Sequence, residues 1–340
     1  MTGTREAATM RAAVITSPGP AENVVVETRP RPVPGAGEVL VRVHASAMNR
    51  ADILQRKGLY PPPPGAPRDI TGLEIAGTVV SAGPGAPRWK PGDRVFGLVP
   101  GGGHAEYAVA HEDTLVAVPS TLSWRDAGAV PEAFITANDA LDQAAMRDGE
   151  TVLVHAVASG VGLAAVQLVR ARGGTALGTS RTPAKLDGAK ALGLSDGWVA
   201  DRGLEGLGDW VRSRTEGRGA DVVLDLVGGA YFPASILALA PRGRLVLIGT
   251  MAGAEATIPL GAVLRERLTV RGTVLRTRAL EERARDAAAF AARVVPLLAR
   301  GEVRAVVDAV LPLDRIAEAH RLVETNATAG KVVIRTSDED

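Results

Sequence analysis

Residues 151–170 read TVLVHAVASGVGLAAVQLVR, and this stretch decides the fold. Its first four residues are apolar or β-branched, as in a strand that is buried on both faces. Small residues follow, and the apolar positions after them recur at the spacing of one helix face, at Val161, Ala165, Leu168 and Val169. The pattern predicts a strand, a tight turn and a helix. Such a turn lets backbone N–H groups and the helix dipole approach a pyrophosphate.

The turn departs from the strict G-x-G-x-x-G fingerprint of dinucleotide-binding proteins. The nearest match is Ala156-x-x-Ser159-x-x-Gly162, with an additional Gly160. A turn of small residues, taken alone, equally fits close packing of the helix on the strand. If the dinucleotide interpretation holds, the residues that meet the pyrophosphate are Ala158, Ser159, Gly160, Val161 and Gly162.

The segments that follow repeat the alternation of strand and helix. Strand-like apolar runs cover residues 175–179, 221–226 and 245–248, a helical stretch covers 183–192, and glycines follow the later strands at 228, 229 and 249. This alternation predicts an α/β fold with a parallel, doubly wound sheet whose ligand lies at the carboxyl ends of the strands. A dinucleotide site is therefore favoured over packing alone.

The charge at the end of the second strand indicates which dinucleotide is bound. NAD-preferring sites usually place Asp or Glu about 20 residues past the glycines. This chain has Ser180 and Arg181 there, with Lys185 one helical turn later. A hydroxyl and a guanidinium bind a 2′-phosphate that a carboxylate repels. We expect NADPH, with NADH less favoured; the alternative is that Arg181 and Lys185 are ordinary solvated charges.

Length and composition exclude several classes of protein. A chain of 340 residues with 46% hydrophobic content predicts two globular domains. Its 39 basic residues nearly balance 38 acidic ones, which argues against a nucleic-acid partner. No apolar run reaches the roughly 18 residues that cross a bilayer, and no signal-peptide pattern is evident. We expect a cytoplasmic protein with neither membrane nor nucleic acid as partner.

The chain contains no cysteine, which excludes disulfides, thiolate nucleophiles and cysteine-ligated zinc. Its five histidines form no HExxH motif or other closely spaced pair with carboxylates. No metal site is expected.

The first 120 residues have a different pattern. Residues 1–9 are polar and expected to be mobile, and short strands punctuated by Gly and Pro follow, which predicts a partly open β-barrel. A short helix over 49–56 leads to Tyr60 and four prolines, interpreted either as a linker or as a rigid pocket rim. Helices are expected over 121–145 and 281–300. Strand-like runs at 306–310 and 331–334 indicate a return to the first domain.

Motifs along the chain then allow a comparison with known families. They are EVLVRV (38–43), NRAD (49–52), GLY (58–60), GLEIAG (72–77), KPGDRV (90–95), HAVASGVG (155–162) and GK (330–331). In this order they resemble the medium-chain dehydrogenase/reductase superfamily, specifically its zinc-free quinone oxidoreductase branch, over nearly all of residues 10–335.

The resemblance implies a GroES-like catalytic domain over 10–130 that resumes over 273–340, and a Rossmann domain over 131–272, with the cofactor in the cleft. Zinc-dependent relatives carry a catalytic cysteine where this chain has residues 47–49 (AMN), and their Gly-His-Glu is Gly72-Leu73-Glu74 here. Both departures agree with the expectation of no zinc.

The resemblance also implies direct hydride transfer from NADPH to a quinone, with Asn49 and Tyr60 lining the acceptor pocket. The same correspondence gives positions at the cofactor: Thr136 near the nicotinamide, Gly228, Gly249, Thr250 and Met251 beneath the cofactor, Leu275 and Arg276 at the nicotinamide end, and Lys331 close to the cleft. Related NADPH enzymes often have an Asn-Tyr pair after the third strand. Asp201 lies in that region here and would weaken a 2′-phosphate site if it pointed inward.

Two alternatives remain open at this point. One is an NADPH-dependent reductase of conjugated enones, enals or enoyl thioesters, which shares the scaffold and the hydride geometry. The other is a non-catalytic NADPH-binding sensor. An additional strand over residues 268–275 would lie at the sheet edge, and because exposed apolar edges tend to be paired, we expect a homodimer through the Rossmann edge strands.

Overall fold

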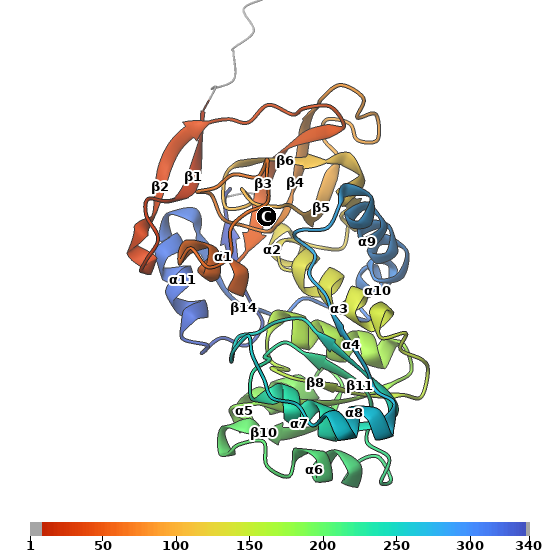
Figure 1. Ribbon diagram of the computed structural model, residues 1–340. Coiled ribbons are helices and arrows are strands. Elements are labelled where there is room, and N and C mark those ends of the chain that lie inside the picture. The colour runs from red at the N-terminus through yellow and green to blue at the C-terminus, as the bar shows by residue number, and fades with distance from the viewer. Residues whose placement is uncertain (1–8, 338–340) are drawn as a thin grey trace, which may run out of the picture. The chain divides into compact units, whose positions relative to one another are not determined.

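The computed structural model describes residues 9–337, which form two compact units (Figure 1). Unit 1 contains the described residues up to Ile135 and from Arg276 onward, and unit 2 contains Thr136–Leu275. The expected mobile extension, residues 1–9, lies outside the described residues except for Thr9, which begins strand β1.

Unit 2 is built on a six-stranded sheet in which every neighbouring pair is parallel. The order is β10-β9-β8-β11-β12-β13, so the strand order reverses between β8 and β11. The strands are β8 (Thr151–Val154), β9 (Thr175–Ser180), β10 (Leu194–Val199), β11 (Ala220–Asp225), β12 (Leu239–Leu247) and β13 (Thr269–Gly272). The predicted doubly wound sheet is confirmed, and ligands of such sheets bind at the carboxyl ends beside the reversal.

Helices alternate with these strands. They are α4 (Gly160–Ala171), α5 (Pro183–Lys190), η3 (Ala200–Arg202), α6 (Leu207–Ser213), α7 (Tyr231–Ala238) and α8 (Leu260–Glu266). All four residues of β8 are buried, as the apolar run at 151–154 predicts. Leu153, Val223 and Leu245 from three neighbouring strands lie in one apolar core cluster with residues of the helices.

The edge strand β13 is shorter than the sequence indicates. Pairing covers four residues, Thr269–Gly272, all of them exposed, instead of the expected 268–275. Thr273 still donates its N–H to Leu247 O, and its hydroxyl donates to Asp139 Oδ2 at 2.8 Å. This side-chain bond holds the chain to α3 (Pro131–Gln143) where the strand ends.

Unit 1 contains a seven-stranded mixed sheet and a two-stranded hairpin. The sheet runs β14-β15-β3-β4-β5-β7, with β6 also paired to β3. Its strands are β3 (Glu38–Ala47), β4 (Glu74–Ala82), β5 (Arg94–Leu98), β6 (Tyr107–His111), β7 (Leu115–Ala117), β14 (Val307–Pro312) and β15 (Lys331–Arg335). The hairpin is β1 (Thr9–Ile15) with β2 (Val24–Pro30). The last segment lies in unit 1, where β15 pairs with β3.

Unit 1 also contains several helices, which differ from the sequence prediction at two places. The helices are η1 (Ala21–Asn23), α1 (Arg50–Arg56), η2 (Glu112–Thr114), α2 (Trp124–Gly128), α9 (Leu280–Arg293), α10 (Val295–Ala299), η4 (Leu313–Arg315) and α11 (Ile316–Glu324). The single helices expected over 121–145 and 281–300 are each divided in two, with Pro131 and Pro296 at the start of the second helix. Proline has no N–H to continue the helical hydrogen-bond ladder, and it fits a first turn.

None of the helices in the described part of the chain is both long enough and apolar enough to cross a membrane.

Candidate functional site

The turn between β8 and α4 brings backbone groups close together. Ala156 has φ +48°, a left-handed conformation that is unusual for a residue other than glycine. Ser159 caps α4, and its hydroxyl accepts the N–H of Gly162 at 3.0 Å. A Cβ on Gly162 would lie 2.6 Å from the carbonyl oxygens of Ala156 and Val157, so only glycine fits. This is the close approach of strand and helix that a dinucleotide-binding turn requires.

The end of β9 lies against this turn, because the Val157 N–H donates to Thr179 O at 2.9 Å. Ser180 is buried at the strand end, Arg181 is exposed after it, and Lys185 is half-buried in α5. The Arg181 charge acts on the half-buried Tyr231 and opposes the rise in pKa that burial gives this phenol. Tyr231 was missed by the sequence reasoning, although it follows the glycine pair at 228–229.

A second glycine-lined corner follows β11. The buried Asp225 Oδ1 accepts the N–H groups of Val227 and Gly228, both at 2.8 Å, while its Oδ2 has no hydrogen-bond partner. Gly228 has φ +65°, and a Cβ on Gly249 would lie 2.7 Å from Leu226 O. The loops after β11 and β12 therefore pack backbone against backbone, which leaves Thr250 and Met251 exposed beside them.

Two further predicted residues lie at the limits of unit 2. Thr136 is buried, and its hydroxyl has no hydrogen-bond partner in the structure. Leu275 is also buried. A buried hydroxyl without a partner in the protein is available to form a hydrogen bond with a bound ligand. Glycine-lined turns at two strand ends allow a pyrophosphate to approach the backbone closely. The residues of unit 2 therefore fit a nicotinamide dinucleotide, with Ala158 buried and Gly160 and Val161 half-buried in the first turn.

Unit 1 gathers a set of polar and ionisable residues around a completely buried carboxylate. We call Glu74, Lys331, Asn49, Asp52 and Glu132 the Glu74 cluster. Glu74 Oε1 accepts from Lys331 Nζ at 2.7 Å and from Asn49 Nδ2 at 2.9 Å, and Oε2 accepts the Glu132 N–H at 2.9 Å. Three segments far apart in the sequence therefore meet at one carboxylate.

The side chain of Asn49 is fully engaged within this cluster. Its Nδ2 donates to Glu74 and, at 3.1 Å, to Ala47 O, and its Oδ1 accepts from Lys331 Nζ. The Asn49 N–H also donates to Asp52 Oδ2 at 2.7 Å, while Asp52 Oδ1 accepts the Gly72 N–H at 2.9 Å. The structure thus gives Asn49 and Lys331 a shared part in holding Glu74. Their contacts with acceptor and cofactor stay predictions.

The loop that carries Tyr60 is held by Arg276. The guanidinium carbon lies 5.1 Å from the centre of the Tyr60 ring, and Nη1 donates to the Tyr60 carbonyl at 3.4 Å. Nη2 donates to Gln55 Oε1 at 2.6 Å and Nε to Pro100 O at 2.8 Å. Arg276 is buried, and its guanidinium joins the Tyr60 loop to Gln55 and Pro100. A cofactor contact for it stays a prediction. The Tyr60 loop is thus held in place, and its part as the rim of a pocket stays a prediction.

Electrostatics sets the protonation of this region. Burial, and then the nearby Glu132, raise the pKa of Tyr60 against the effect of Arg276, so the phenol keeps its proton at neutral pH. Burial, and then the Glu74 charge, raise the pKa of Glu132 to about 8. His104 is buried, and its pKa is lowered by burial. Its Nδ1 lies 2.9 Å from Thr71 Oγ1.

Within residues 9–337, no group of three or more His, Cys, Asp or Glu side chains is arranged so that it could hold a metal ion.

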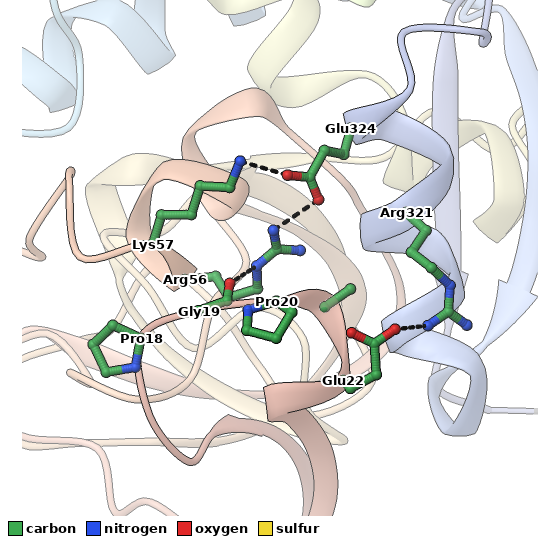
Figure 2. A pocket seen from close by; sticks show the side chains of 9 residues that line it. Pro18, Gly19, Pro20, Glu22, Arg56, Lys57, Arg321 and Glu324 are labelled. Carbon is green, nitrogen blue, oxygen red and sulfur yellow. Dashed lines mark hydrogen bonds and ion pairs between the residues drawn. The ribbon is translucent and has the colours of Figure 1, made fainter.

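A separate cavity of about 460 Å³ lies in unit 1 between α1, α11 and the loop before η1 (Figure 2). Its lining includes the completely buried Arg56, whose Nη2 donates to Glu324 Oε2 at 2.7 Å. Lys57 pairs with Glu324 Oε1 at 2.5 Å, and Arg321 pairs with Glu22 at 2.5 Å. Figure 2 shows Glu324 reaching Arg56, the last residue of α1, and Lys57, which directly follows it. Glu324 thus ties α11 to the helix that follows Asn49.

We expect Glu324→Gln to lower the free energy of unfolding by about 1–3 kcal/mol at pH 7, because it removes the charged partner of buried Arg56. Lys57, then Arg56, lower the pKa of Glu324 from 4.5 to about 2. The stabilisation is therefore complete above about pH 4.5 and is lost as pH falls toward 2. Urea unfolding from pH 7 to pH 2.5 measures it, and the difference between variant and wild type should shrink with the pH.

Glu22→Gln is the matched control, because it breaks the exposed Glu22–Arg321 pair at the same cavity. It should leave the stability nearly unchanged, because solvent screens a pair of exposed charges. Equal losses for the two variants would contradict the role assigned to buried Arg56.

Comparisons with known proteins agree with this geometry. The model of the alcohol dehydrogenase GroES-like domain matches residues 35–120, and that of the zinc-binding dehydrogenases matches 204–334. A quinone oxidoreductase of Pseudomonas aeruginosa is 34% identical over 307 residues, which are 88% of this chain and 92% of that protein. A mycobacterial protein solved in complex with NADPH has 28% identity and a TM-score of 0.87, covering 96% of this chain and 100% of that one.

The chain is also similar to a segment of a much larger enzyme, a polyketide-type synthase. Erythronolide synthase EryA2 of Saccharopolyspora erythraea is 43% identical over 215 residues, 63% of this chain. The chain spans only 6% of the length of that synthase.

Proposed function

We propose that this protein reduces quinones with NADPH and without zinc. The premise is that the chain belongs to the medium-chain dehydrogenase/reductase superfamily and is a quinone oxidoreductase-like enzyme of it. The observation that carries the proposal is the Tyr60 phenol, a neutral hydrogen-bond donor on a loop fixed by Arg276. A donor that is held in place stabilises the negative charge that develops on an acceptor oxygen.

The nicotinamide, when bound, supplies a hydride to the acceptor. Ser159 and Gly162 at the first turn and Gly228 and Gly249 at the second corner would hold the pyrophosphate with backbone groups. The unpartnered hydroxyl of Thr136 would contact the nicotinamide. Ser180, Arg181 and Lys185 would bind the 2′-phosphate.

The decisive experiment is oxidation of NADPH in the presence of 1,2-naphthoquinone, repeated with NADH. We expect turnover with both cofactors and a higher kcat/KM with NADPH. Preference for NADH would contradict the cofactor assignment. Absence of quinone turnover despite NADPH binding would direct attention to other acceptors.

We expect Arg181→Ala to raise KM for NADPH about 10- to 100-fold, because it removes a charged hydrogen-bond donor to the 2′-phosphate. KM for NADH should not change, since NADH lacks that phosphate. Arg212→Ala is the matched control, because Arg212 is an exposed arginine of unit 2 paired with Asp209 on α6. An equal rise of KM for both cofactors would contradict the assignment.

A second candidate is reduction of a conjugated C=C bond in an enone, enal or acyl thioester. The identity of 43% to a segment of erythronolide synthase favours it, because growing polyketide chains are acyl thioesters. A kcat/KM for an enone above that for every quinone tested would support this second activity over quinone reduction. Tight NADPH binding without turnover of any acceptor would instead support a sensor.

The proposal includes a cytoplasmic homodimer. Strand β13 supports it, because this strand lies at the sheet edge with all four residues exposed and offers unpaired backbone groups.

A further inference from the structure

Glu132 is the acidic residue of the Glu74 cluster that reaches Glu74 through its backbone. It lies in the first turn of α3, where its backbone N–H is fixed by Glu74 Oε2. Among residues 9–337, no side chain or backbone group forms a hydrogen bond or ion pair with its carboxyl group. Glu132 is half-buried, so this group keeps some access to the outside of the protein.

Burial and the charges of four nearby residues determine the protonation of Glu132. Glu74 on β4 and Asp52 on α1 repel a negative charge there, while Lys331 on β15 and Arg276 attract one. Burial has the largest effect, and the pKa of the carboxyl rises to about 8. Glu132 is therefore largely protonated at pH 7, and it can release a proton near that pH, as a general acid must.

Glu132 also lies within electrostatic reach of the acceptor-binding loop. It raises the pKa of Tyr60, and it acts on the guanidinium of Arg276, which lies over the Tyr60 ring. Glu132 and Tyr60, the residue that we assign to acceptor binding, therefore lie in the same region of unit 1.

The other ionisable groups nearby are committed to different contacts. Glu74 accepts three hydrogen bonds, and Asp52 accepts two backbone N–H groups. Lys331 is held by Glu74 and Asn49. Both ring nitrogens of buried His104 face partners, Thr71 Oγ1 and Ala47 O. Among the described acids of this region, Glu132 is thus the one whose carboxyl group forms no hydrogen bond with the protein.

We propose that Glu132 donates the proton that completes reduction of the acceptor, while Tyr60 binds the acceptor oxygen. The inference rests on the proposed function. Reduction of a quinone to a hydroquinone consumes one hydride, supplied by NADPH, and one proton. The O–H bond of the Glu132 carboxylic acid breaks, an O–H bond forms on the reduced acceptor, and the remaining carboxylate takes a proton from water.

The test compares Glu132→Gln with the wild type from pH 6 to pH 10. The wild-type kcat should fall as pH rises through about 8, since the acid form is then lost. The variant should have a kcat lower by about 10²-fold or more, without that fall. Glutamine has the same shape and leaves the backbone bond to Glu74 intact. Because the fold disfavours the charged form of Glu132, the variant should be at least as thermally stable as the wild type at pH 8.

Infrared spectroscopy supplies a readout that does not depend on turnover. A band of a protonated carboxyl C=O should be present at pH 7, disappear as pH passes about 8, and be absent in Glu132→Gln. Glu318→Gln is the matched control, because it removes an exposed carboxylate of unit 1 paired with Arg315. It should leave the kcat, its pH profile and the band unchanged.

Each outcome separates this inference from the proposed function. A wild type that reduces quinones, with Glu132→Gln equal to it in kcat and pH profile, would overturn the proton assignment alone, as would absence of the infrared band at pH 7. A wild type that binds NADPH but reduces neither quinones nor enones would overturn the proposed function, and with it the proton transfer.

Discussion

Lys331→Met is expected to lower the free energy of unfolding by about 3–5 kcal/mol, because it leaves a buried carboxylate without its cation. The Lys331 side chain is 5% exposed and that of Glu74 is 0% exposed, so water cannot replace the lost partner. Methionine keeps most of the volume and the apolar stem of lysine. Urea unfolding at pH 7, followed by tryptophan fluorescence, measures the loss.

The control for this experiment is the double variant Glu74→Gln/Lys331→Met. Glutamine has no charge, but its amide oxygen can still accept from Asn49 or from the Glu132 N–H. Removing the charge together with its partner should therefore recover much of the stability. A single variant as stable as the wild type, or a double variant no better than the single one, would contradict the importance of the buried pair.

Tyr60→Phe is expected to lower kcat/KM for 1,2-naphthoquinone about 10²- to 10³-fold, since it removes one fixed donor to the developing oxyanion. The aromatic ring remains under Arg276, so the loop should keep its conformation. Steady-state kinetics with saturating NADPH measures the change, and fluorescence titration should show unaltered affinity for NADPH.

Tyr107→Phe is the matched control for Tyr60→Phe. Tyr107 is another half-buried tyrosine of unit 1 with an arginine, Arg31, 4.9 Å from its ring centre. It lies on β6 and has no part in the proposed site. It should keep the wild-type kcat/KM, and equal losses in both variants would show that the Tyr60 hydroxyl has no specific role.

Much of the candidate cofactor site was accessible from local sequence, because its residues lie close together along the chain. Ser159 and Gly162 are three positions apart in one turn, and Arg181 directly follows a strand. Tyr231 was missed because a tyrosine two residues beyond a glycine pair carries no pattern of its own. Its proximity to Arg181 exists only once the parallel strands are assembled.

Local sequence alone predicts the strand–turn–helix at 151–170, the doubly wound sheet and the lack of thiol chemistry, because these depend on periodicity and composition. It did not determine where helices divide at Pro131 and Pro296, since a proline fits the first turn of a helix as well as a break. Lys331 meets Glu74 across 257 positions of sequence, and Arg276 contacts the Tyr60 loop, because folding brings these segments together. The protonation of Glu132 likewise depends on the folded structure. The pKa of a carboxyl depends on its burial and on the charges around it, and folding supplies both.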